Sequence, residues 1–538
     1  MQRATISSPA VSSLARVAER VGLARLALWA SGLALLALAG FVFGPCLTNG
    51  LVSDDWVFLY FVWGAPTLRQ AMQFFNFGYQ SYWFVRPVEW LATWVLYKAS
   101  GTNPVAYHLA SVLLNLADGV LFGVLAYWLI ERSSTNRRRS LVASIAAFAL
   151  FVFNWRHHEA VFWYSSINEL FSALFRLAAL LLLIYAFESQ GRKGKRWIAY
   201  LCSLAIYALA LLSKESSVVF PAEMLLLLLC VRLMAGELFG KQILVRLAAW
   251  APFLALTVVW GIEYAATSDS QSSAIVARSG HTLITNAPIR DMLLHFLQYL
   301  NGNLIGLGAL ASSPAALSFE LVALAAIAVL ALVRRQYLWV FALLWSLAAV
   351  APYALMAGES YVQQRQPILA LGIEGDRYLY YSAAGFALLL VMSALWIADE
   401  ASRLVGPERG RWVMGLAGLG FAVLLSLNVH MLVLQGAQWR TAGAISNHIL
   451  TTILTRVPKP KPNSIVCLRN LPDSYEGKYI FRNGVEGALA VAWSTYDVGF
   501  KKTVQSSPSS PAPPLDESGC TYVFSYDAKT QSLAFRER

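Results

Sequence analysis

The chain has 538 residues, of which 57% are hydrophobic and 13% are charged, and its mean hydropathy is +0.54. Soluble domains carry roughly 25% charged residues, so this composition excludes a soluble multi-domain enzyme and a disordered chain. It favours a polytopic helical membrane protein. The net charge of +12 is then first an orientation signal, which leaves nucleic acid as a poor second interpretation. The five cysteines contain no C-x-x-C pair, so no zinc or redox motif stands out.

About eleven stretches are apolar enough to cross a bilayer, which takes about 20 residues. In chain order they lie near residues 26–45, 104–130, 139–153, 166–187, 197–213, 215–231, 246–266, 316–333, 337–357, 378–398 and 412–434. The fifth and sixth are separated only by Ser213-Lys214-Glu215, and we interpret them as two spans rather than one bent segment. We therefore expect an all-α membrane domain over residues 26–434, after a cytoplasmic segment of residues 1–25.

Lys and Arg gather in the N-terminal segment and in every second connection, including Arg137–Arg139 and Arg192–Arg196. Cytoplasmic loops carry an excess of these residues. This pattern predicts a cytoplasmic N-terminus and, with an odd number of spans, a C-terminus on the opposite side. The Ala-rich composition favours a bacterial inner membrane, with the C-terminus in the periplasm.

The composition becomes that of a soluble domain from about Gln435, so residues 435–538 form a second unit on the non-cytoplasmic side. We expect a helical neck and then a small α/β or mainly β domain. Cys467 and Cys520 fall on strand-like runs, and both a disulfide and two separate buried thiols remain open. The strand-like runs are Ser464–Leu468, Lys478–Phe481, Thr521–Ser525 and Ser532–Arg536.

A long loop, residues 47–103, follows the first span and carries the acidic pair Asp54-Asp55 near its start. Adjacent carboxylates point in different directions, so one can face a site while the other binds a neighbour. Beside a cavity at the membrane, such a carboxylate can act as general base on a hydroxyl; the alternative is a helix cap. Two further stretches of this loop, Leu68–Phe75 and Pro87–Ala99, are expected to be short helices along the membrane surface.

Other ionisable residues within the membrane or at its non-cytoplasmic edge are candidates for function, because burying a charge there is costly. His157 and Glu159 belong to the run Arg156-His157-His158-Glu159. A metal site here is a weak interpretation, since adjacent residues do not share a helix face. A polar wall of a substrate cleft is the better one, and Glu169, two to three turns further on, supports it.

Two basic residues have both a structural and a functional interpretation. Lys214-Glu215 is either a self-neutralising pair at the bilayer edge or a lysine that meets a phosphate. Arg377 follows Asp376 at the start of the tenth span. It either extends to the lipid headgroups or holds a lipid phosphate bidentately.

Five segments of the chain resemble, in order, the GT-C class of polytopic glycosyltransferases, and most closely the protein O-mannosyltransferases, including those with tetratricopeptide repeats. They are Ser53-Asp54-Asp55-Trp56; Arg86-Pro87 with Gly101-Thr102-Asn103-Pro104 and His108; Asn154–Leu170; Ser213-Lys214-Glu215; and Asp376–Phe386. The resemblance covers residues 26–400 but not 435–538, and no tetratricopeptide repeats follow. Asn154-Trp155 replaces the family's His-Pro, Ile167 replaces its arginine, and its proline after the tyrosine cluster is absent.

The resemblance implies that a polyprenyl- or dolichyl-phosphate sugar is the donor and that an acceptor hydroxyl attacks it, with inversion, from the non-cytoplasmic side. It implies an acidic base in the first loop, with Asp54 as the first choice and Asp55 as the second. Arg377 and Lys214 are then candidates for the donor phosphate. No metal or other cofactor is expected. Arg86, His157, Glu159, Glu169 and Glu215 are expected to line the substrate cleft.

We therefore expect an integral-membrane glycosyltransferase with a polyprenyl-phosphate-linked donor, the bilayer as its environment, no nucleic-acid partner and an acceptor that the sequence does not identify. The alternatives are a transporter or flippase of lipid-linked glycans and a polysaccharide polymerase or ligase. Transporters place polar residues near the bilayer midplane, often in inverted repeats. This chain places them at one rim and shows no repeat.

Overall fold

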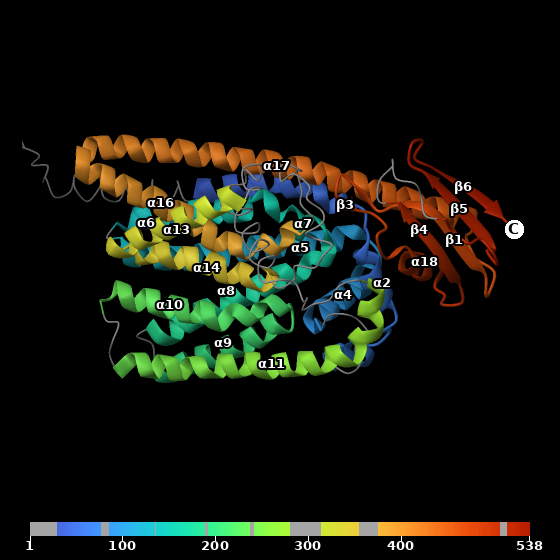
Figure 1. The fold of residues 1–538 in the computed structure, drawn as a ribbon, viewed down its shortest axis with the longest axis horizontal. Helices are drawn as coiled ribbons and strands as arrows, with labels where there is room; N and C mark the ends of the chain where they lie inside the picture. Colours follow the sequence, from blue (N-terminus) through green and yellow to red (C-terminus); the bar gives the residue numbers. More distant parts are fainter. Residues whose placement is uncertain are drawn as a thin grey trace, which may run out of the picture.

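The computed structural model describes residues 29–76, 85–134, 136–188, 192–236, 241–279, 314–354, 375–505 and 514–538. A bundle of long helices forms one end of the molecule and a small sheet forms the other (Figure 1). The expected segment 1–25 and residues 280–313 and 355–374 lie outside the described residues.

The bundle is built from α-helices that follow one another along the chain, with short 3-10 turns at several breaks. The α-helices are α5 (Pro104–Ser133), α6 (Arg137–Val152), α7 (His158–Phe162), α8 (Ile167–Glu188), α9 (Lys193–Leu211), α10 (Phe220–Met234), α11 (Lys241–Ser279), α13 (Pro314–Val333), α14 (Tyr337–Ala354), α16 (Ser382–Val405) and α17 (Pro407–Arg456). The 3-10 turns are η1 (Gly44–Thr48), η4 (Trp155–His157), η5 (Tyr164–Ser166), η6 (Glu215–Val219) and η7 (Asp376–Leu379).

Helices occupy every position at which the sequence predicts a span. Among the described residues, 7 helices are long and apolar enough to cross a membrane, or up to 8 if the pair Arg137–Val152 and Trp155–Phe162, bent by 43°, counts as one span. The remaining predicted positions hold α9 and the shorter apolar helices Val322–Val333 and Tyr337–Tyr353. The multi-pass helical architecture is therefore confirmed, and the two stretches around Lys214 are separate helices, α9 and α10.

The first loop contains three helical segments before the bundle proper. The predicted surface helices are found as α3 (Leu68–Ala71) with η2 (Met72–Phe75), and as α4 (Pro87–Ser100). A third helix in this loop, α2 (Asp54–Trp63), begins at the acidic pair and was not predicted. Proline suits the first turn of α4, since the missing N–H would have no helical partner there.

The longest helix, α17, connects the bundle to the C-terminal domain as one continuous rod of 50 residues (Figure 1). Its C-terminal half supplies Ile449 and Ile453 to the core of that domain. Gly443 allows α17 to approach the first loop, because a Cβ there would lie 2.5 Å from the nitrogen of Gly50. The neck expected after Gln435 is therefore the same helix as the last span.

The C-terminal domain contains a four-stranded sheet of order β4-β1-β5-β6, in which β1 is parallel to β4 and β5, and β6 is antiparallel to β5. The helix α18 (Val485–Trp493) precedes β4 and makes the crossover that parallel neighbours need. The predicted strand-like runs are confirmed, whereas β4 and α18 were not predicted. The strands are β1 (Ile465–Pro472), β2 (Ser474–Tyr475), β3 (Lys478–Tyr479), β4 (Gly499–Gln505), β5 (Tyr522–Asp527) and β6 (Ser532–Glu537).

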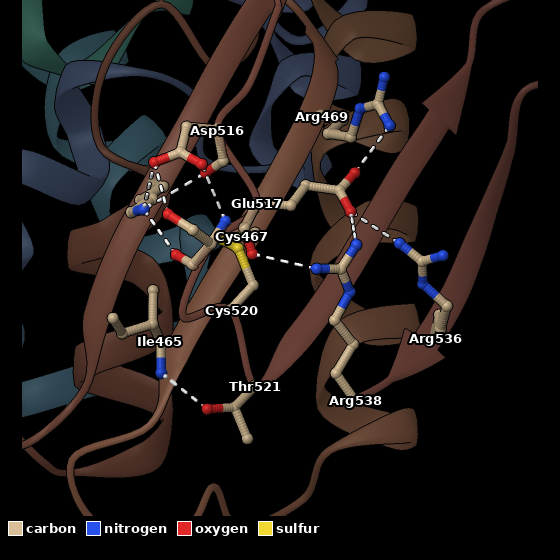
Figure 2. The surroundings of a disulfide bond; sticks show 11 residues. Ile465, Cys467, Arg469, Asp516, Glu517, Cys520, Thr521, Arg536 and Arg538 are labelled. Atoms are coloured by element: carbon tan, nitrogen blue, oxygen red, sulfur yellow. Dashed lines mark hydrogen bonds and ion pairs between the residues drawn. A yellow bond between two sulfur atoms is a disulfide. The ribbon is translucent and has the colours of Figure 1, made fainter.

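A disulfide joins Cys467 in β1 to Cys520, just before β5, with Cα atoms 5.9 Å apart (Figure 2). The question that the sequence left open is thus answered in favour of the bonded pair. The loop before β5 also carries Glu517, whose carboxylate accepts hydrogen bonds from Arg469 (2.8 Å) and Arg536 (2.7 Å) (Figure 2). The disulfide and these ion pairs fix the loop to β1 and β6, the two strands that flank β5.

Candidate functional site

The acidic pair lies where the first loop meets the C-terminal domain. Ser53, the residue before α2, has φ 45° and ψ −119°, a left-handed backbone that is strained for a residue with a side chain. Its N–H donates to the carbonyl oxygen of Ile480 at 2.8 Å. The C-terminal domain therefore holds the backbone that presents Asp54 and Asp55.

Asp55 is fully buried, and hydrogen bonds occupy both of its carboxylate oxygens. Oδ1 accepts from the N–H of Ser165 at 2.8 Å and from its hydroxyl at 2.6 Å, and Oδ2 accepts from the N–H of Val52 at 3.0 Å. Burial raises the pKa of Asp55 to about 7, although these three donors lower it. Asp55 thus anchors α2 to η5.

Asp54 is only half-buried, and its two oxygens differ. Oδ1 accepts from Nδ2 of Asn483 at 2.9 Å, whereas Oδ2 accepts no hydrogen bond from any residue that the structure describes. Burial raises the pKa of Asp54, while the Asn483 bond and the charges of Arg377 and Arg482 lower it. Of the two predicted bases, Asp54 is the one with an oxygen available for a proton.

The segment Arg156–Glu159 turns inward and meets η7. Arg156 donates to Oδ1 of Asp376 at 2.6 Å, and Nε2 of His158 lies 3.2 Å from Oδ2 of Asp376. The indole N–H of Trp439 donates to Nδ1 of His158 at 3.1 Å, so Nδ1 carries no proton and Nε2 carries the one that faces Asp376. Burial alone would raise the pKa of Asp376, but Arg156 and His158 hold it below its ordinary value.

Glu159 fixes Arg377, the predicted phosphate ligand. The two side chains form an ion pair, and Oε2 of Glu159 accepts from the N–H groups of Gly375 (3.0 Å) and Arg377 (3.1 Å). The guanidinium also donates to the hydroxyl of Tyr378 at 2.8 Å and lies 5.1 Å from the ring centroid of Trp163. The Arg377 side chain is 16% exposed, so it is oriented by the protein yet still accessible.

Lys214, the second predicted phosphate ligand, is buried beside the same tyrosine. Its ammonium donates to Oδ1 of Asn168 at 3.1 Å and forms an ion pair with Glu169. It lies 5.2 Å from the ring centroid of Tyr378, whose ring is 4.5 Å from the Arg377 guanidinium. Lys214 and Arg377 are thus brought together around Tyr378, each paired with a carboxylate.

The adjacent residues Lys214 and Glu215 pair with other parts of the chain rather than with each other. Glu215 binds Arg86 bidentately, at 3.0 Å from Nε to Oε1 and 2.8 Å from a terminal nitrogen to Oε2. Glu89, in the first turn of α4 and just after Arg86, accepts from Asn168 at 2.9 Å. These bonds connect the first loop to the Lys214 pair, so Arg86, Glu169 and Glu215 form one polar network.

His157 differs from its neighbours in the predicted cleft. Its ring is fully buried and lies 4.3 Å from the Tyr380 ring centroid and 5.0 Å from that of Phe151. The structure therefore places His157 among aromatic side chains of the bundle. Within the described residues, no three His, Cys, Asp or Glu side chains are grouped so that they could hold a metal ion.

The C-terminal domain contributes two site residues, Asn483 and Lys478, that the sequence analysis did not find. Lys478 is 1% exposed, and its ammonium makes no hydrogen bond or ion pair with the residues described here. Burial lowers the pKa of Lys478 to about 8, although the charges of Asp376 and Glu159 raise it. A lone Lys and a lone Asn outside the resembling region gave no signal that could have identified them.

Three aromatic rings pack where the bundle, α17 and β3 meet. Trp163 lies 4.7 Å from Tyr479 and 6.1 Å from Trp439, measured between ring centroids. Each ring has a cation beside it, which supports an electrostatic contribution to this packing. The cations are Arg377 at Trp163 (5.1 Å), Lys478 at Trp439 (5.9 Å) and Arg482 at Tyr479 (4.6 Å).

No protein-family model and no curated protein matches this sequence. Among solved structures, ArnT from Cupriavidus metallidurans bound to undecaprenyl phosphate is similar at 13% identity and a TM-score of 0.47, over 88% of this chain and 86% of that chain. The oligosaccharyltransferase AglB from Archaeoglobus fulgidus, in complex with an inhibitory peptide and a dolichol-phosphate, is similar at 12% identity and a TM-score of 0.39, over 80% of this chain and 62% of that chain.

Proposed function

We propose that this chain is an integral-membrane glycosyltransferase that moves a sugar from a polyprenyl-phosphate-linked donor to an acceptor hydroxyl on the non-cytoplasmic side. The observation that carries the proposal is the environment of Asp54. One of its oxygens is held by Asn483 and the other has no partner among the described residues, at a site that also contains Arg377. The ordered sequence resemblance to GT-C enzymes supports the same function.

In the proposed reaction, Oδ2 of Asp54 takes the proton of the acceptor hydroxyl as its oxygen attacks the anomeric carbon. The bond between that carbon and the phosphate oxygen breaks, and the lipid phosphate leaves with the bonding electrons. Cationic side chains stabilise the negative charge that develops on this leaving group. Arg377 and Lys214 are the candidates from the bundle, and Lys478 is the candidate from the C-terminal domain.

The pairing of both bundle cations supports a role in positioning rather than simple attraction. Glu159 and Tyr378 orient the Arg377 guanidinium, and Glu169 and Asn168 orient the Lys214 ammonium. Groups that are already oriented need little reorganisation when charge develops in the reaction. In this proposal His158, Asp376 and Arg156 support the cleft without touching the donor.

The disulfide in the C-terminal domain supports a site outside the cytoplasm, because disulfides persist in oxidising compartments. We infer a bacterial inner-membrane location with the C-terminus in the periplasm. In Figure 1 the C-terminal end of α10, the N-terminal end of α11 and the α16–α17 connection lie at the end of the bundle opposite the C-terminal sheet, which agrees with this orientation.

A buried ion pair inside the bundle is the observation that would favour the alternative function, a transporter of lipid-linked glycans. Arg176 in α8 and Glu223 in α10 are each 1% exposed and pair with each other, and such residues at membrane depth are often functional. Tyr381 also donates to Glu223 at 3.3 Å. These contacts leave the pair satisfied, and the transferase remains the better-supported function.

Glycan analysis of deletion cells tests the proposal. Proteins, lipopolysaccharide and cell-wall polymer are compared between deletion cells, cells restored with the wild-type chain and cells restored with Asp54→Asn. We expect one glycan class to lose a sugar in the deletion and in the variant, and to regain it with the wild-type chain. Unchanged glycans in the deletion, or full restoration by the variant, would contradict the proposal.

A further inference from the structure

The C-terminal domain docks directly on α2 through two glycines. Gly484 has φ 85°, and a Cβ there would lie 2.1 Å from the carbonyl oxygen of Ser53 and 3.0 Å from Cβ of Trp56. A Cβ on Gly487 would lie 2.9 Å from both the carbonyl oxygen of Trp56 and Cβ of Tyr60. The first turn of α18 therefore touches α2 with no side chain of its own in between.

Asn483 stands immediately before this contact. Its side-chain nitrogen, which can only donate, gives a hydrogen bond of 2.9 Å to Oδ1 of Asp54. Three residues earlier, the carbonyl oxygen of Ile480 accepts from the N–H of Ser53 at 2.8 Å. One short segment of the C-terminal domain thus fixes both the backbone before Asp54 and one oxygen of its carboxylate.

We propose that Asn483 is a positioning residue for transfer: it holds Oδ1 of Asp54 so that Oδ2 faces the acceptor hydroxyl, which makes the C-terminal domain part of the transferase site. This inference rests on the proposed function, in which Asp54 is the base. A donor to the carboxylate also favours its charged form, so Asn483 keeps the base ionised at lower pH than it otherwise would be.

The pH dependence of transfer tests this role. Full-length wild type, Asn483→Ala and Asn483→Asp are assayed in nanodiscs by the release of polyprenyl phosphate from a polyprenyl-phosphate-linked sugar donor, with membranes from deletion cells as the acceptor source. We expect the acid limb of the rate profile to move upward by about one pH unit in Asn483→Ala, which corresponds to the loss of one hydrogen bond to a charged group. The limb should move further in Asn483→Asp, because a second carboxylate beside Asp54 disfavours its ionisation.

Two glycine variants test the docking with matched controls. Gly484→Ala places a methyl group against Ser53, whereas Gly519→Ala, at the similar φ of 75°, meets only Cδ1 of Ile465 at 3.7 Å. Both variants strain the backbone of the same domain, but only the first disturbs the contact with α2. We expect Gly484→Ala to reduce transfer at least tenfold more than Gly519→Ala does.

The outcomes separate this inference from the proposed function. If Asp54→Asn is inactive but the acid limb stays at its wild-type pH in both folded Asn483 variants, the positioning role is wrong and the proposed base stands. If Asp54→Asn retains full transfer, the base and the positioning role both fail. Equal transfer by the Gly484 and Gly519 variants would also overturn the part assigned to the C-terminal domain.

Discussion

Replacing each acid of the pair by its amide should separate two effects. Asp55→Asn should mainly lower the stability of the fold, and Asp54→Asn should mainly lower the rate of transfer. In Asp55→Asn, the new amide NH2 faces a donor, because both oxygens of Asp55 accept hydrogen bonds in the wild-type chain. A hydrogen bond to a charged group contributes about 1.5–3 kcal/mol, and a buried donor left without a partner costs about 1–3 kcal/mol. We therefore expect Asp55→Asn to lower the free energy of unfolding by about 2–4 kcal/mol.

Asp54→Asn should leave the fold nearly unchanged. Asp54 is half-buried and accepts one hydrogen bond, and the oxygen of an asparagine can still accept it from Asn483. We expect a stability change below about 1 kcal/mol. A general base contributes about 10²–10⁴-fold to a rate, so transfer should fall by that factor.

The assay combines thermal unfolding of the purified variants, followed by the fluorescence of the 18 tryptophans, with polyprenyl phosphate release in nanodiscs. Asp54→Asn should unfold at nearly the wild-type temperature and be inactive, while Asp55→Asn should unfold earlier. Wild-type transfer by Asp54→Asn, or equal destabilisation by both changes, would refute the assignment of a base and an anchor.

Three further predictions concern the pKa of Asp54, the phosphate site at Arg377 and the disulfide. Because the base must be deprotonated and burial raises the pKa of Asp54, the wild-type transfer rate should fall on acidification with a midpoint above the ordinary Asp value of about 3.9; a lower midpoint in the pH–rate profile would contradict this. Arg377→Gln should weaken the binding of undecaprenyl phosphate in nanodiscs about tenfold through the loss of a charge-assisted contact. Arg403→Gln, at an arginine that is 69% exposed in the last turn of α16, serves as the control, and equal affinity of both variants would remove Arg377 from the phosphate site. Replacing Cys467 and Cys520 together by serine should lower the free energy of unfolding by about 2–4 kcal/mol, since the bond closes a loop with a sequence separation of 53; unchanged urea unfolding would show that the bond adds no stability.

The sequence was sufficient for those features that each segment determines by itself. The spans can be predicted because backbone polar groups in lipid must be hydrogen-bonded, and each helix satisfies its own groups within one segment. The runs at β1, β5 and β6 carry alternating or β-branched residues. By contrast, β4 has the sequence GFKKTVQ, and its two adjacent lysines interrupt the strand pattern. Its pairing with β1 is seen only in the folded chain.

The site itself could be predicted only on the side of the bundle. Short runs with unusual charge for a membrane protein contain the acidic pair, Arg377 and Lys214. This charge allowed these residues to be predicted as site residues from the sequence. Asn483 and Lys478 belong to an ordinary soluble composition, and only the folded chain places them beside Asp54 and Asp376. The strained backbone of Ser53 could not be predicted from the sequence either, because it depends on the contact with Ile480.

The contact between Asp54 and Asn483 joins residues 429 positions apart in the chain, and this separation sets an order for biogenesis. In the proposed orientation, the first loop is translocated early in synthesis, whereas Asn483 follows the last helix of the bundle. Ser53 and Asp54 therefore lack their partners Ile480 and Asn483 until the segment after α17 has been made and the C-terminal domain has folded. A chain interrupted after α17 would insert its helices but lack the contacts to Ser53 and Asp54, so the proposed activity requires the C-terminal domain to have folded against the first loop.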